Sequence, residues 1–369
     1  MTSDARTRRA YGQQCRDGAV PGAAGSRLIG PVVAFKRAEI TSHDVARLAG
    51  VSQPTVSRAL REDPRVSEQT RERVRRAAAS LNYVPNEVGR NLSTRSTRRV
   101  AMVADLGNPL YPQLMGPVHA ALDERGYRMM LFAENGDADP ASVYDRLFDQ
   151  SIDGVILTTT RIGSTLPAAL ARRGIPYVML NRTLPGADAS SCVADNAGGA
   201  RQVAAQFLSD GRRRIAALLG PEQTSTARER EHGFRQTLAD AGVALPERYL
   251  RWGWFHYEVG YAGMKSLMAE RPAPEAVFCA NDHVAVGAIN LAHELGIAIP
   301  DDVALIGFDD LPVASWPVFA LTTVRVPFDD MSIAVVEQLA EALSGSVAAP
   351  KQRVFPTHLV LRSTHGRTR

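Results

Sequence analysis

Four polar side chains within six positions could make the hydrogen bonds that read the edges of nucleic-acid bases. They are Gln53, Thr55, Ser57 and Arg58. A glutamine amide can pair with adenine through two hydrogen bonds, an arginine guanidinium can pair with guanine in the same way, and hydroxyl groups serve either base. Such reading requires that these side chains project together from one rigid element, which the surrounding sequence must supply.

A first short helix is expected just before these side chains. Val45, Leu48 and Ala49 show the i, i+3, i+4 spacing of one apolar helix face. Gly50 follows them, and glycine readily adopts the left-handed backbone that ends a helix. Ala46, four residues before Gly50, is small enough to let a second helix cross closely.

A second helix should carry the polar side chains themselves. Ser52 can cap its start, and Pro54 is tolerated there because it falls in the first turn. Val56, Ala59 and Leu60 repeat the apolar spacing on one face, so the polar side chains face outward. Two short helices, a glycine turn and a shared apolar seam are typical of a helix-turn-helix. A helical hairpin with a generic polar surface is the alternative.

A third helix is predicted after this pair. Ser67 can cap it, and Val74, Ala77, Ala78 and Leu81 form an apolar stripe. Several arginines lie on its other faces, at Arg71, Arg73, Arg75 and Arg76. We expect some of them to contact phosphates, which position a module without specifying sequence, and others to be merely solvated.

The net charge of +4 conceals an uneven distribution. Residues 36–99 contain 14 basic and seven acidic side chains, whereas residues 100–369 contain 24 basic and 30 acidic ones. A basic module ahead of an acidic body favours a polyanionic partner for the first part only, although a solvated basic surface would give the same count. A chain of 369 residues exceeds one ordinary domain, so two or three compact units are expected.

These segments resemble the headpiece of the LacI/GalR family of bacterial repressors. The resemblance continues to about Ser363 and rests on Val45–Arg58, Val66–Ser67, Thr70–Arg71, Val74 and Leu81–Asn86. It implies an N-terminal all-α helix-turn-helix headpiece followed by an α/β two-lobed domain like that of periplasmic binding proteins, with two Rossmann-like parallel-sheet lobes. It also implies a homodimer on palindromic operator DNA, in which each headpiece places its second helix in the major groove.

The resemblance also implies roles on the DNA for individual residues. Phosphate contacts are implied for Thr41, Ser52, Thr55 and Tyr83, whereas Gln53, Pro54 and Arg58 lie where bases are read. The complete predicted DNA-binding set is Thr41, Ser52, Gln53, Pro54, Thr55, Ser57, Arg58, Tyr83, Asn86 and Leu92. Pro54 departs from the commoner polar residue at its position, and without a donor it can offer only an apolar contact, for example to a thymine methyl group.

A weak helix is expected between the headpiece and the rest of the chain. Pro85 ends the third helix, and the segment 86–92 is too short to be a stable helix alone. Gly89, where the family usually has alanine, weakens it by about 1 kcal/mol. One interpretation is a disordered linker. The resemblance implies a hinge helix that orders on operator DNA, where Leu92 wedges between base steps in the minor groove.

Strand–helix alternation begins near Arg98. Short apolar strands are predicted at 99–105, 127–132, 154–158 and 177–180, with helices near 112–125, 141–150 and 165–173. The pattern repeats with strands at 214–219, 275–280 and 303–307. Short apolar strands separated by helices indicate parallel sheets covered on both faces. Two similar halves predict two lobes, with ligands bound at the carboxyl ends of the strands.

The expected domain organisation combines these patterns with the resemblance. Residues 1–38 form a basic, glycine- and alanine-rich extension that we expect to be disordered. The headpiece then spans 39–84, the hinge helix and linker 85–97, and the effector-binding and dimerisation domain 98–369. By resemblance the chain crosses between the lobes near Asp195, Val326 and Lys351. Lobe 1 would therefore contain about 98–195 and 327–351, and lobe 2 about 196–326 and 352–363.

Polar residues at strand ends are the candidates for binding a small-molecule effector. The resemblance implies that Arg230, Asn281 and Asp309 hydrogen-bond hydroxyl groups, since guanidinium and carboxylate forks suit vicinal diols. It implies that three aromatic residues pack against the apolar face of the effector, namely Tyr111, Phe255 and Phe328. Helix capping or an ion pair between the lobes is the alternative for each polar residue. That alternative is preferred for Asp310 and Arg228.

Two departures from the family leave the identity of the effector open. Asn181, which completes the predicted effector site, stands where many members carry aspartate and so removes one formal charge. Val326 stands where many members carry glutamine. A sugar is the default effector of the family, and a sugar acid or a nucleobase remains an alternative.

Other classes of protein are less compatible with the sequence. No G-x-G-x-x-G, G-x-x-x-x-G-K-[S/T] or G-x-S-x-G motif occurs, so we expect no enzyme, no catalytic residue and no cofactor. The three cysteines and eight histidines show no metal-ligand spacing. A periplasmic sugar-binding protein would need a signal peptide and would carry no helix-turn-helix, so a cytoplasmic protein without a membrane partner is expected. Repressor and activator remain open.

Overall fold

The computed structural model describes residues 40–83, 96–134, 147–148, 151–345 and 349–366. The chain divides into two compact units, Met1–Asn86 and Glu87–Arg369. The first unit contains the headpiece and the second contains the two α/β lobes. The predictions for the extension at 1–38, for the hinge helix with Asn86 and Leu92, and for most of a helix near 141–150 lie outside the described residues.

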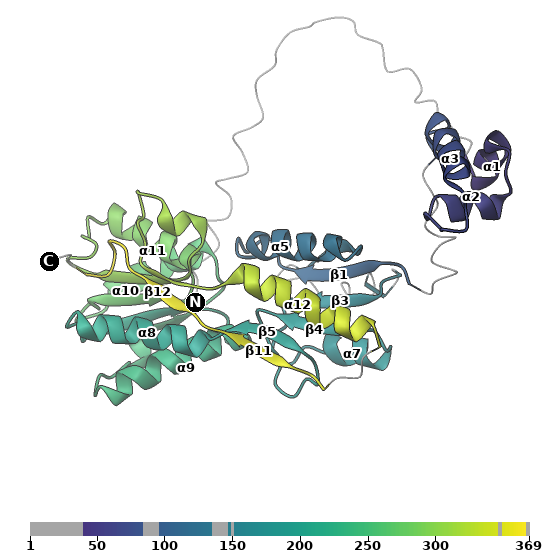
Figure 1. Cartoon of the computed structure of the whole chain (residues 1–369). Helices are drawn as coiled ribbons and strands as arrows, with labels where there is room; N and C mark the ends of the chain where they lie inside the picture. Colours follow the sequence, from purple (N-terminus) through teal and green to yellow (C-terminus); the bar gives the residue numbers. More distant parts are fainter. Residues whose placement is uncertain (1–39, 84–95, 135–146, 149–150, 346–348, 367–369) are drawn as a thin grey trace, which may run out of the picture. The chain divides into compact units, whose positions relative to one another are not determined.

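Three helices form the headpiece around one small apolar core. They are α1 (Ser42–Ala49), α2 (Gln53–Ala59) and α3 (Glu68–Ser80) (Figure 1). Side chains from all three helices fill the core, including Val45, Val56 and Val74, which are fully buried. The predicted helix-turn-helix and the third helix are therefore confirmed.

The ends of the headpiece helices follow from local chemistry. The backbone N–H and the hydroxyl of Thr41 both donate to the Asp44 carboxylate, at 2.9 and 2.8 Å, at the start of α1. Gly50 ends α1 with φ 62°, the left-handed conformation expected there. Ser52 caps α2, since its hydroxyl accepts a hydrogen bond from the Thr55 N–H at 3.4 Å, and Ser67 caps α3 in the same way.

One core prediction for the headpiece was wrong. The Leu48 side chain is 57% exposed, and Ala46 joins Val45 and Ala49 in the core instead. Successive helical residues are rotated by about 100°, so Ala46 and Leu48 lie on opposite sides of Val45. Ala49 lies on the same side as Ala46, and α2 packs against that side.

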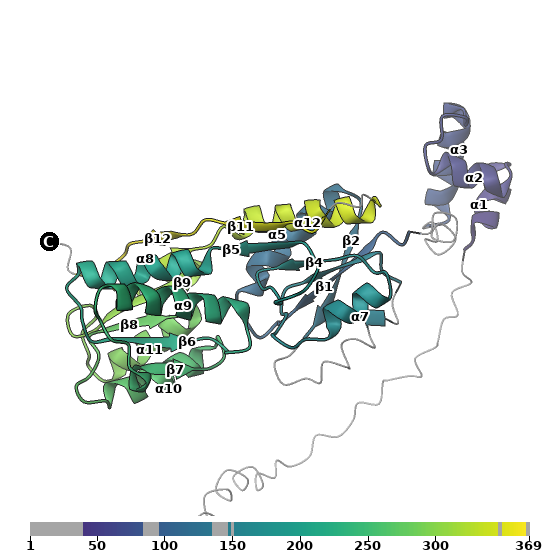
Figure 2. The same ribbon diagram turned by 90° about the horizontal axis from the view of Figure 1, so that it is seen from below.

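The first lobe is built on a six-stranded sheet in the order β11-β5-β4-β3-β1-β2. Its strands are β1 (Arg99–Ala104), β2 (Arg128–Ala133), β3 (Gly154–Leu157), β4 (Tyr177–Leu180), β5 (Ser191–Ala194) and β11 (Gln352–Phe355). Helices α5 (Tyr111–Glu124) and α12 (Phe328–Leu343) cover one face, and α7 (Leu166–Arg172) covers the other (Figures 1 and 2). The β1 strand is buried on both faces, because Val100 and Met102 point toward α5 and α12 whereas Ala101 and Val103 point toward α7.

The second lobe repeats this plan in the order β12-β10-β9-β8-β6-β7. Its strands are β6 (Ile215–Leu219), β7 (Leu250–Trp252), β8 (Ala276–Cys279), β9 (Ala304–Asp309), β10 (Thr323–Arg325) and β12 (His358–Val360). Its α-helices are α8 (Asn196–Ser209), α9 (Ser225–Asp240), α10 (Tyr257–Met268) and α11 (Asp282–Glu294), with the 3-10 turns η1 (Glu247–Tyr249) and η2 (Pro312–Ser315). Helices α8 and α9 lie side by side, as do α10 and α11 (Figure 1).

The equal strand orders confirm the predicted internal repeat. Every neighbouring pair of strands in the two sheets is parallel except β10 and β12. In each lobe the strand order reverses direction beside the first strand, β1 or β6, and ligands of parallel α/β sheets bind at the carboxyl ends of strands near such a point. We therefore expect ligand-binding residues in the loops that follow β1, β3, β6 and β8.

The chain passes between the two sheets three times. It leaves the first sheet after β5, returns after β10 with α12, and leaves again between β11 and β12. The crossing expected near Lys351 was placed too early, because β11 pairs with β5 from Gln352↔Ser191 to Phe355↔Ala194 and belongs to the first sheet. The last crossing therefore falls at residues 356–357. The Thr357 hydroxyl donates to the carbonyl of Asp195 at 3.0 Å and ties two crossings together.

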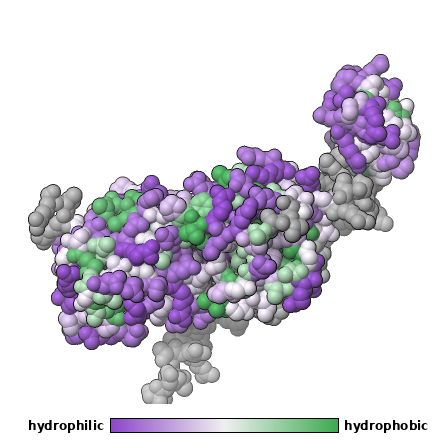
Figure 3. Space-filling model, turned by 60° about the horizontal axis from the view of Figure 1, so that its bottom comes forward, coloured by the Kyte–Doolittle hydropathy of each residue, from purple (hydrophilic) through white to green (hydrophobic). Residues whose placement is uncertain are grey.

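The surface differs between the two units. The headpiece surface visible in Figure 3 is mostly hydrophilic, whereas several hydrophobic patches appear on the lobes. Among the described residues, no helix combines the length and the hydrophobicity needed to span a bilayer.

Candidate functional site

The predicted base-reading side chains share the short helix α2. Pro54 and Arg58 are exposed, and Gln53, Thr55 and Ser57 are half-buried. Arg58 forms no salt bridge with any residue of the described headpiece, so its guanidinium is available to a partner.

Three other polar groups of this surface already have partners inside the headpiece. The Gln53 amide donates to the Ser42 hydroxyl at 3.2 Å and thereby links α2 to α1. The hydroxyls of Ser52 and Thr55 lie 2.8 Å apart. The bond to Ser42 uses one of the two N–H donors of the Gln53 amide, which leaves the other donor and the amide oxygen for a base, whereas Arg58 gives up no salt bridge.

The arginines of α3 have protein partners. Arg71 pairs with Glu68 at 3.1 Å, Arg75 with Glu62 at 2.8 Å, and Arg76 with Glu72 at 3.0 Å. Arg73 is exposed. Three of the four arginines thus have an acidic partner within the headpiece, and their phosphate contacts stay a prediction. Among the predicted phosphate-contacting residues, Thr41 and Ser52 are exposed, and Tyr83 is half-buried against the headpiece core.

A narrow cavity lies between the two lobes. Asn108, Leu110, Asn181 and Arg182 line it from the first lobe, and Thr226, Arg230, Phe255, Asn281 and Asp309 line it from the second. The structure thus brings together five of the predicted effector residues: Asn181, Arg230, Phe255, Asn281 and Asp309. The space open to the centre of a water molecule is only about 10 Å³, so the lobes must separate before a sugar-sized ligand can enter.

A buried ion pair forms the polar centre of the second lobe's side of this cavity. The Arg230 guanidinium lies 3.1 Å from the Asp309 carboxylate, and both side chains are almost fully buried. Arg230 also donates to Asn196 at 2.9 Å and to the carbonyl of Ala280. Burial lowers the pKa of Arg230, and burial raises the pKa of Asp309 to about 6 despite the neighbouring guanidinium.

The backbone is unusual where two of these residues follow their strands. Asn181, after β4, has φ 70°, and Asp309, at the end of β9, has φ 111°. Positive φ is uncommon for residues other than glycine and is concentrated at functional sites. Asn281 instead caps α11, because its side-chain oxygen accepts from the Val284 N–H at 2.8 Å. Its amide donates to the carbonyl of Phe255 at 3.3 Å, so capping coexists with a place in the cavity wall.

Two predicted aromatic residues do not line the cavity. Tyr111 is fully buried, and its hydroxyl donates to the carbonyl of Thr158 at 3.2 Å. Phe328 is buried at the start of α12. Asp310 and Arg228 do not line the cavity either. Asp310 pairs with Arg325 and Arg362, each at 2.7 Å, and Arg228 pairs with Glu222 at 3.2 Å, so their ion pairs lie within the second lobe and not between the lobes.

Four residues that line the cavity were not predicted from the sequence, namely Asn108, Leu110, Thr226 and Arg182. Arg182 matters most, because its side chain is charged and only 4% of the residue is exposed. Its position directly after Asn181 at the end of β4 was the available signal, since strand ends of this sheet converge on the cleft. A long charged side chain in such a loop points to solvent more often than into a cleft, so the sequence did not single it out.

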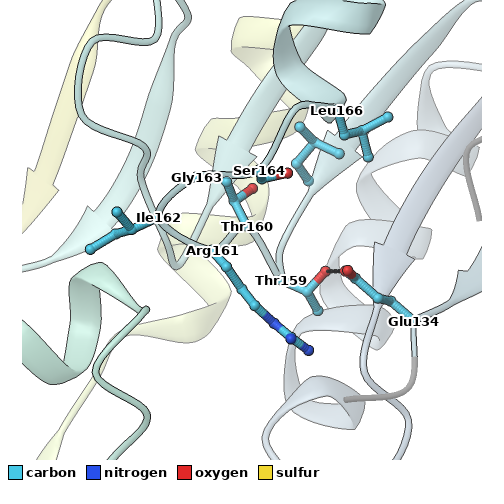
Figure 4. A pocket seen from close by; sticks show the side chains of 9 residues that line it. Glu134, Thr159, Thr160, Arg161, Ile162, Gly163, Ser164 and Leu166 are labelled. Carbon is cyan, nitrogen blue, oxygen red and sulfur yellow. Dashed lines mark hydrogen bonds between the residues drawn. The ribbon is translucent and has the colours of Figure 1, made fainter. Parts of the chain in front are cut away.

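A second pocket opens in the first lobe where β2 and β3 end. Its lining includes Glu134, Thr159, Arg161 and Leu166 (Figure 4). The Thr159 hydroxyl donates to the Glu134 carboxylate, and Arg161 extends toward the same pair. The guanidinium carbon of Arg161 also lies 4.8 Å from the centre of the Trp254 ring in the second lobe, so this loop bridges the two lobes beside the cleft.

Comparison with known proteins identifies the family. The model for bacterial regulatory proteins of the lacI family matches residues 41–86, and the periplasmic binding protein-like domain matches residues 204–365. The HTH-type transcriptional regulator CelR of Thermobifida fusca is 35% identical over 337 residues, which are 89% of this chain and 99% of CelR. The chain belongs to the LacI family. It is therefore a DNA-binding transcriptional regulator with a helix-turn-helix headpiece and a two-lobed domain.

Solved structures of this LacI family resemble most of the chain. The Lac repressor dimer bound to operator and the anti-inducer ONPF has a TM-score of 0.81 at 26% identity and covers 89% of this chain and 99% of its own. The complex of the transcriptional regulator CelR with cellobiose has a TM-score of 0.69 at 33% identity and covers 88% of this chain and 99% of its own. These LacI-family relatives are transcriptional regulators and not enzymes.

Proposed function

We propose that this LacI-family regulator represses transcription as a homodimer on palindromic operator DNA and that a small hydroxylated effector in the interlobe cleft controls its affinity for the operator. The proposal rests on one observation, that the same chain contains a helix suited to reading DNA and a cleft suited to binding a small molecule. The reading helix α2 leaves Arg58 without a salt bridge in the described headpiece, and the cleft of the second unit gathers the Arg230–Asp309 pair with Asn181 and Asn281.

Reading of the operator is assigned to the exposed face of α2. Arg58 and Gln53 make the base contacts, and Pro54 offers an apolar contact. Phosphate contacts come from Thr41, Ser52, Thr55 and Tyr83, and Ser57 lies beside them. Asn86 and Leu92 belong to the hinge proposal, in which the segment 85–97 orders on DNA. The solved Lac repressor structure supports this part of the proposal, since it is a dimer bound to operator.

Effector binding is assigned to the cleft. Because the unoccupied space is about 10 Å³, the described conformation is closed, and entry of an effector must change the relation between the lobes. A ligand that binds one lobe arrangement better than another shifts their populations, and the affinities for effector and operator are then reciprocally coupled. The CelR–cellobiose complex supports a sugar or sugar derivative as the class of effector.

Dimerisation is assigned to the second unit. Large apolar side chains remain exposed on both lobes, including Val354 on β11, at 57%, and Val318 after η2, at 76%. Their burial against a second copy would present two headpieces to the two halves of a palindrome.

Selection of bound DNA from a random pool, with the full chain as bait, tests this function. We expect a palindromic consensus, and we expect titration of that site in a mobility-shift assay to give a steep salt dependence. A panel of sugars and sugar derivatives should then contain compounds that change the operator affinity. Absence of any selected sequence would contradict the DNA-binding proposal, and an operator affinity that no bound compound alters would contradict the coupling.

A further inference from the structure

We infer that the effector of this cleft is an anion, a hydroxylated compound with a carboxylate or phosphate group that pairs with Arg182. The inference rests on the proposed effector role of the cleft and adds the chemical class of its ligand. Arg182 is 4% exposed and lines the cavity from the first lobe. It forms no salt bridge with any residue that the structure describes.

The hydrogen bonds of Arg182 leave part of its guanidinium unused. One terminal nitrogen donates to the carbonyl of Thr159 at 3.3 Å. The Nε atom is buried and has no hydrogen-bond partner. An arginine offers five N–H donors and a fixed positive charge, and a single carbonyl satisfies one donor and none of the charge. A buried group in this condition is costly unless a ligand completes it.

The charges of the cavity wall do not balance. Its charged residues are Arg182, Arg230 and Asp309. Asp309 pairs with Arg230, so the positive charge of Arg182 has no acidic partner among the residues that line the cavity. The residue next to Arg182 is the neutral Asn181, which lines the same cavity. The carboxylate of Glu134, in the neighbouring pocket, accepts the Thr159 hydroxyl and forms no salt bridge with Arg182.

The Phe255 ring places the unpaired cation opposite the paired one. The guanidinium carbons of Arg182 and Arg230 each lie 6.0 Å from the centre of this ring, one from each lobe. A ligand in the cavity therefore meets the Arg230–Asp309 pair and Asn281 on the side of the second lobe and Arg182 on the other side. Hydroxyl groups suit the first side, and an anionic oxygen pair suits the free guanidinium through charge-assisted hydrogen bonds. A neutral sugar would leave the charge of Arg182 buried and uncompensated.

Matched pairs of ligands test this inference with the full chain. The thermal unfolding midpoint and calorimetric affinity are measured with D-glucuronate against D-glucose, D-galacturonate against D-galactose, and D-ribose 5-phosphate against D-ribose. Inorganic phosphate and sulfate are added at constant ionic strength. We expect the anionic members to stabilise the protein more than their neutral partners. The uronate and phosphate arms distinguish a carboxylate from a phosphate as the recognised group.

Variants at the cleft assign the effect to Arg182. R182Q should weaken binding of the anionic members by about tenfold or more, whereas R182K should retain the preference for anions. N181D should raise the unfolding midpoint of the ligand-free protein, because it supplies a carboxylate beside Arg182, and should shift the preference toward neutral sugars. R228Q, at an exposed arginine paired with Glu222, is the matched control and should change neither property.

The outcomes separate this inference from the proposed function. Neutral members that stabilise the wild type as well as the anionic ones, or an anion preference that survives in R182Q, would overturn it. The inference would also be overturned if no anion of the panel stabilised the protein and the N181D substitution lowered the unfolding midpoint of the ligand-free protein. In each of these cases the wild-type protein would still bind its operator. Loss of operator binding by the wild-type protein would instead contradict the proposed function.

Discussion

The Phe255 ring packs directly on the backbone of Gly220, where a Cβ atom would lie 2.0 Å from the nearest ring carbon. Gly220 follows β6, and Phe255 follows β7. Because Gly220 has no side chain, the Phe255 ring can lie this close to the backbone and line the cleft. Both guanidiniums of the cleft are arranged around that ring.

The substitution G220A should displace Phe255 and weaken effector binding. A methyl group cannot occupy the same space as the ring, and overpacking of a close-packed site costs about 1–3 kcal/mol. We expect calorimetry to show an affinity for effector about tenfold lower, with operator binding retained in the absence of effector. G116A is the control, because nothing lies within 4 Å of a Cβ atom at Gly116 in α5. Equal affinities of G220A and wild type would contradict this role of the glycine.

The substitution D153A should loosen the segment through which the headpiece joins the lobes. The Asp153 carboxylate accepts the N–H groups of Thr97 and Arg98 at 2.7 and 2.9 Å and the hydroxyl groups of Ser96 and Thr97. Burial opposes ionisation, but these hydrogen bonds outweigh it and lower the pKa of Asp153. Unpaired donors would cost about 1–3 kcal/mol of unfolding free energy.

Two measurements check this role of Asp153. Limited proteolysis should cut D153A faster near residue 96, and titration with effector should change its operator affinity less than that of the wild type. D123A, at an exposed position of α5, is the control. A D153A protein with unaltered proteolysis and unaltered coupling would refute the anchoring role.

The substitution R58A should reduce operator affinity and relax base preference. A good bidentate contact of arginine with guanine contributes about 1–3 kcal/mol of discrimination, so we expect a loss of about tenfold to a hundredfold. R75A is the matched control, because Arg75 pairs with Glu62 at 2.8 Å and with Glu68 at 3.5 Å within the headpiece. Mobility-shift titrations on the selected site and on single-base variants provide both measurements. A larger loss in R75A than in R58A would reverse the assignment.

Two thiols should resist modification in the folded protein. Cys192 and Cys279 are fully buried, and burial raises the pKa of Cys192 to about 12 and the pKa of Cys279 further still. Because the thiolate is the reactive form, we expect Ellman's reagent to leave both unmodified until denaturant is added. The variant C15S removes the cysteine that lies outside the described residues and isolates these two. Rapid reaction of C15S under native conditions would contradict their burial.

The contribution of Asp309 to the stability of the lobes should fall as the pH rises from about 4 to about 6. The Asp309 pKa is about 6 in the folded protein and near 3.8 in the unfolded chain. Between these values the folded state holds a proton on Asp309 that the unfolded state has released, so the contribution of this group to the free energy of unfolding decreases with pH, by on the order of 3 kcal/mol, and changes no further above pH 6. Asp282, also fully buried, shifts in the same direction. The free energy of unfolding of D309N, measured by denaturant titration at each pH, should depend less on pH than that of the wild type. An equal dependence on pH would contradict the raised pKa of Asp309.

The sequence by itself determined the features that depend on residues a few positions apart. The turn at Gly50 and the caps at Ser52 and Ser67 were predictable, because a helix end is set by its own first and last turns. The repeated apolar strands likewise predicted two parallel-sheet lobes, since their pattern reflects burial on both faces.

Tertiary structure alone decided which residues meet. The apolar spacing predicted that Leu48 faces the core, and only the packing of the three helices decided that this side chain is exposed. The membership of β11 in the first sheet depends on pairing with β5, more than 150 residues earlier in the chain. Arg182 became a candidate for the same reason. Its charge is visible in the sequence, but its burial and its missing partner result from contacts between two lobes that are distant in sequence.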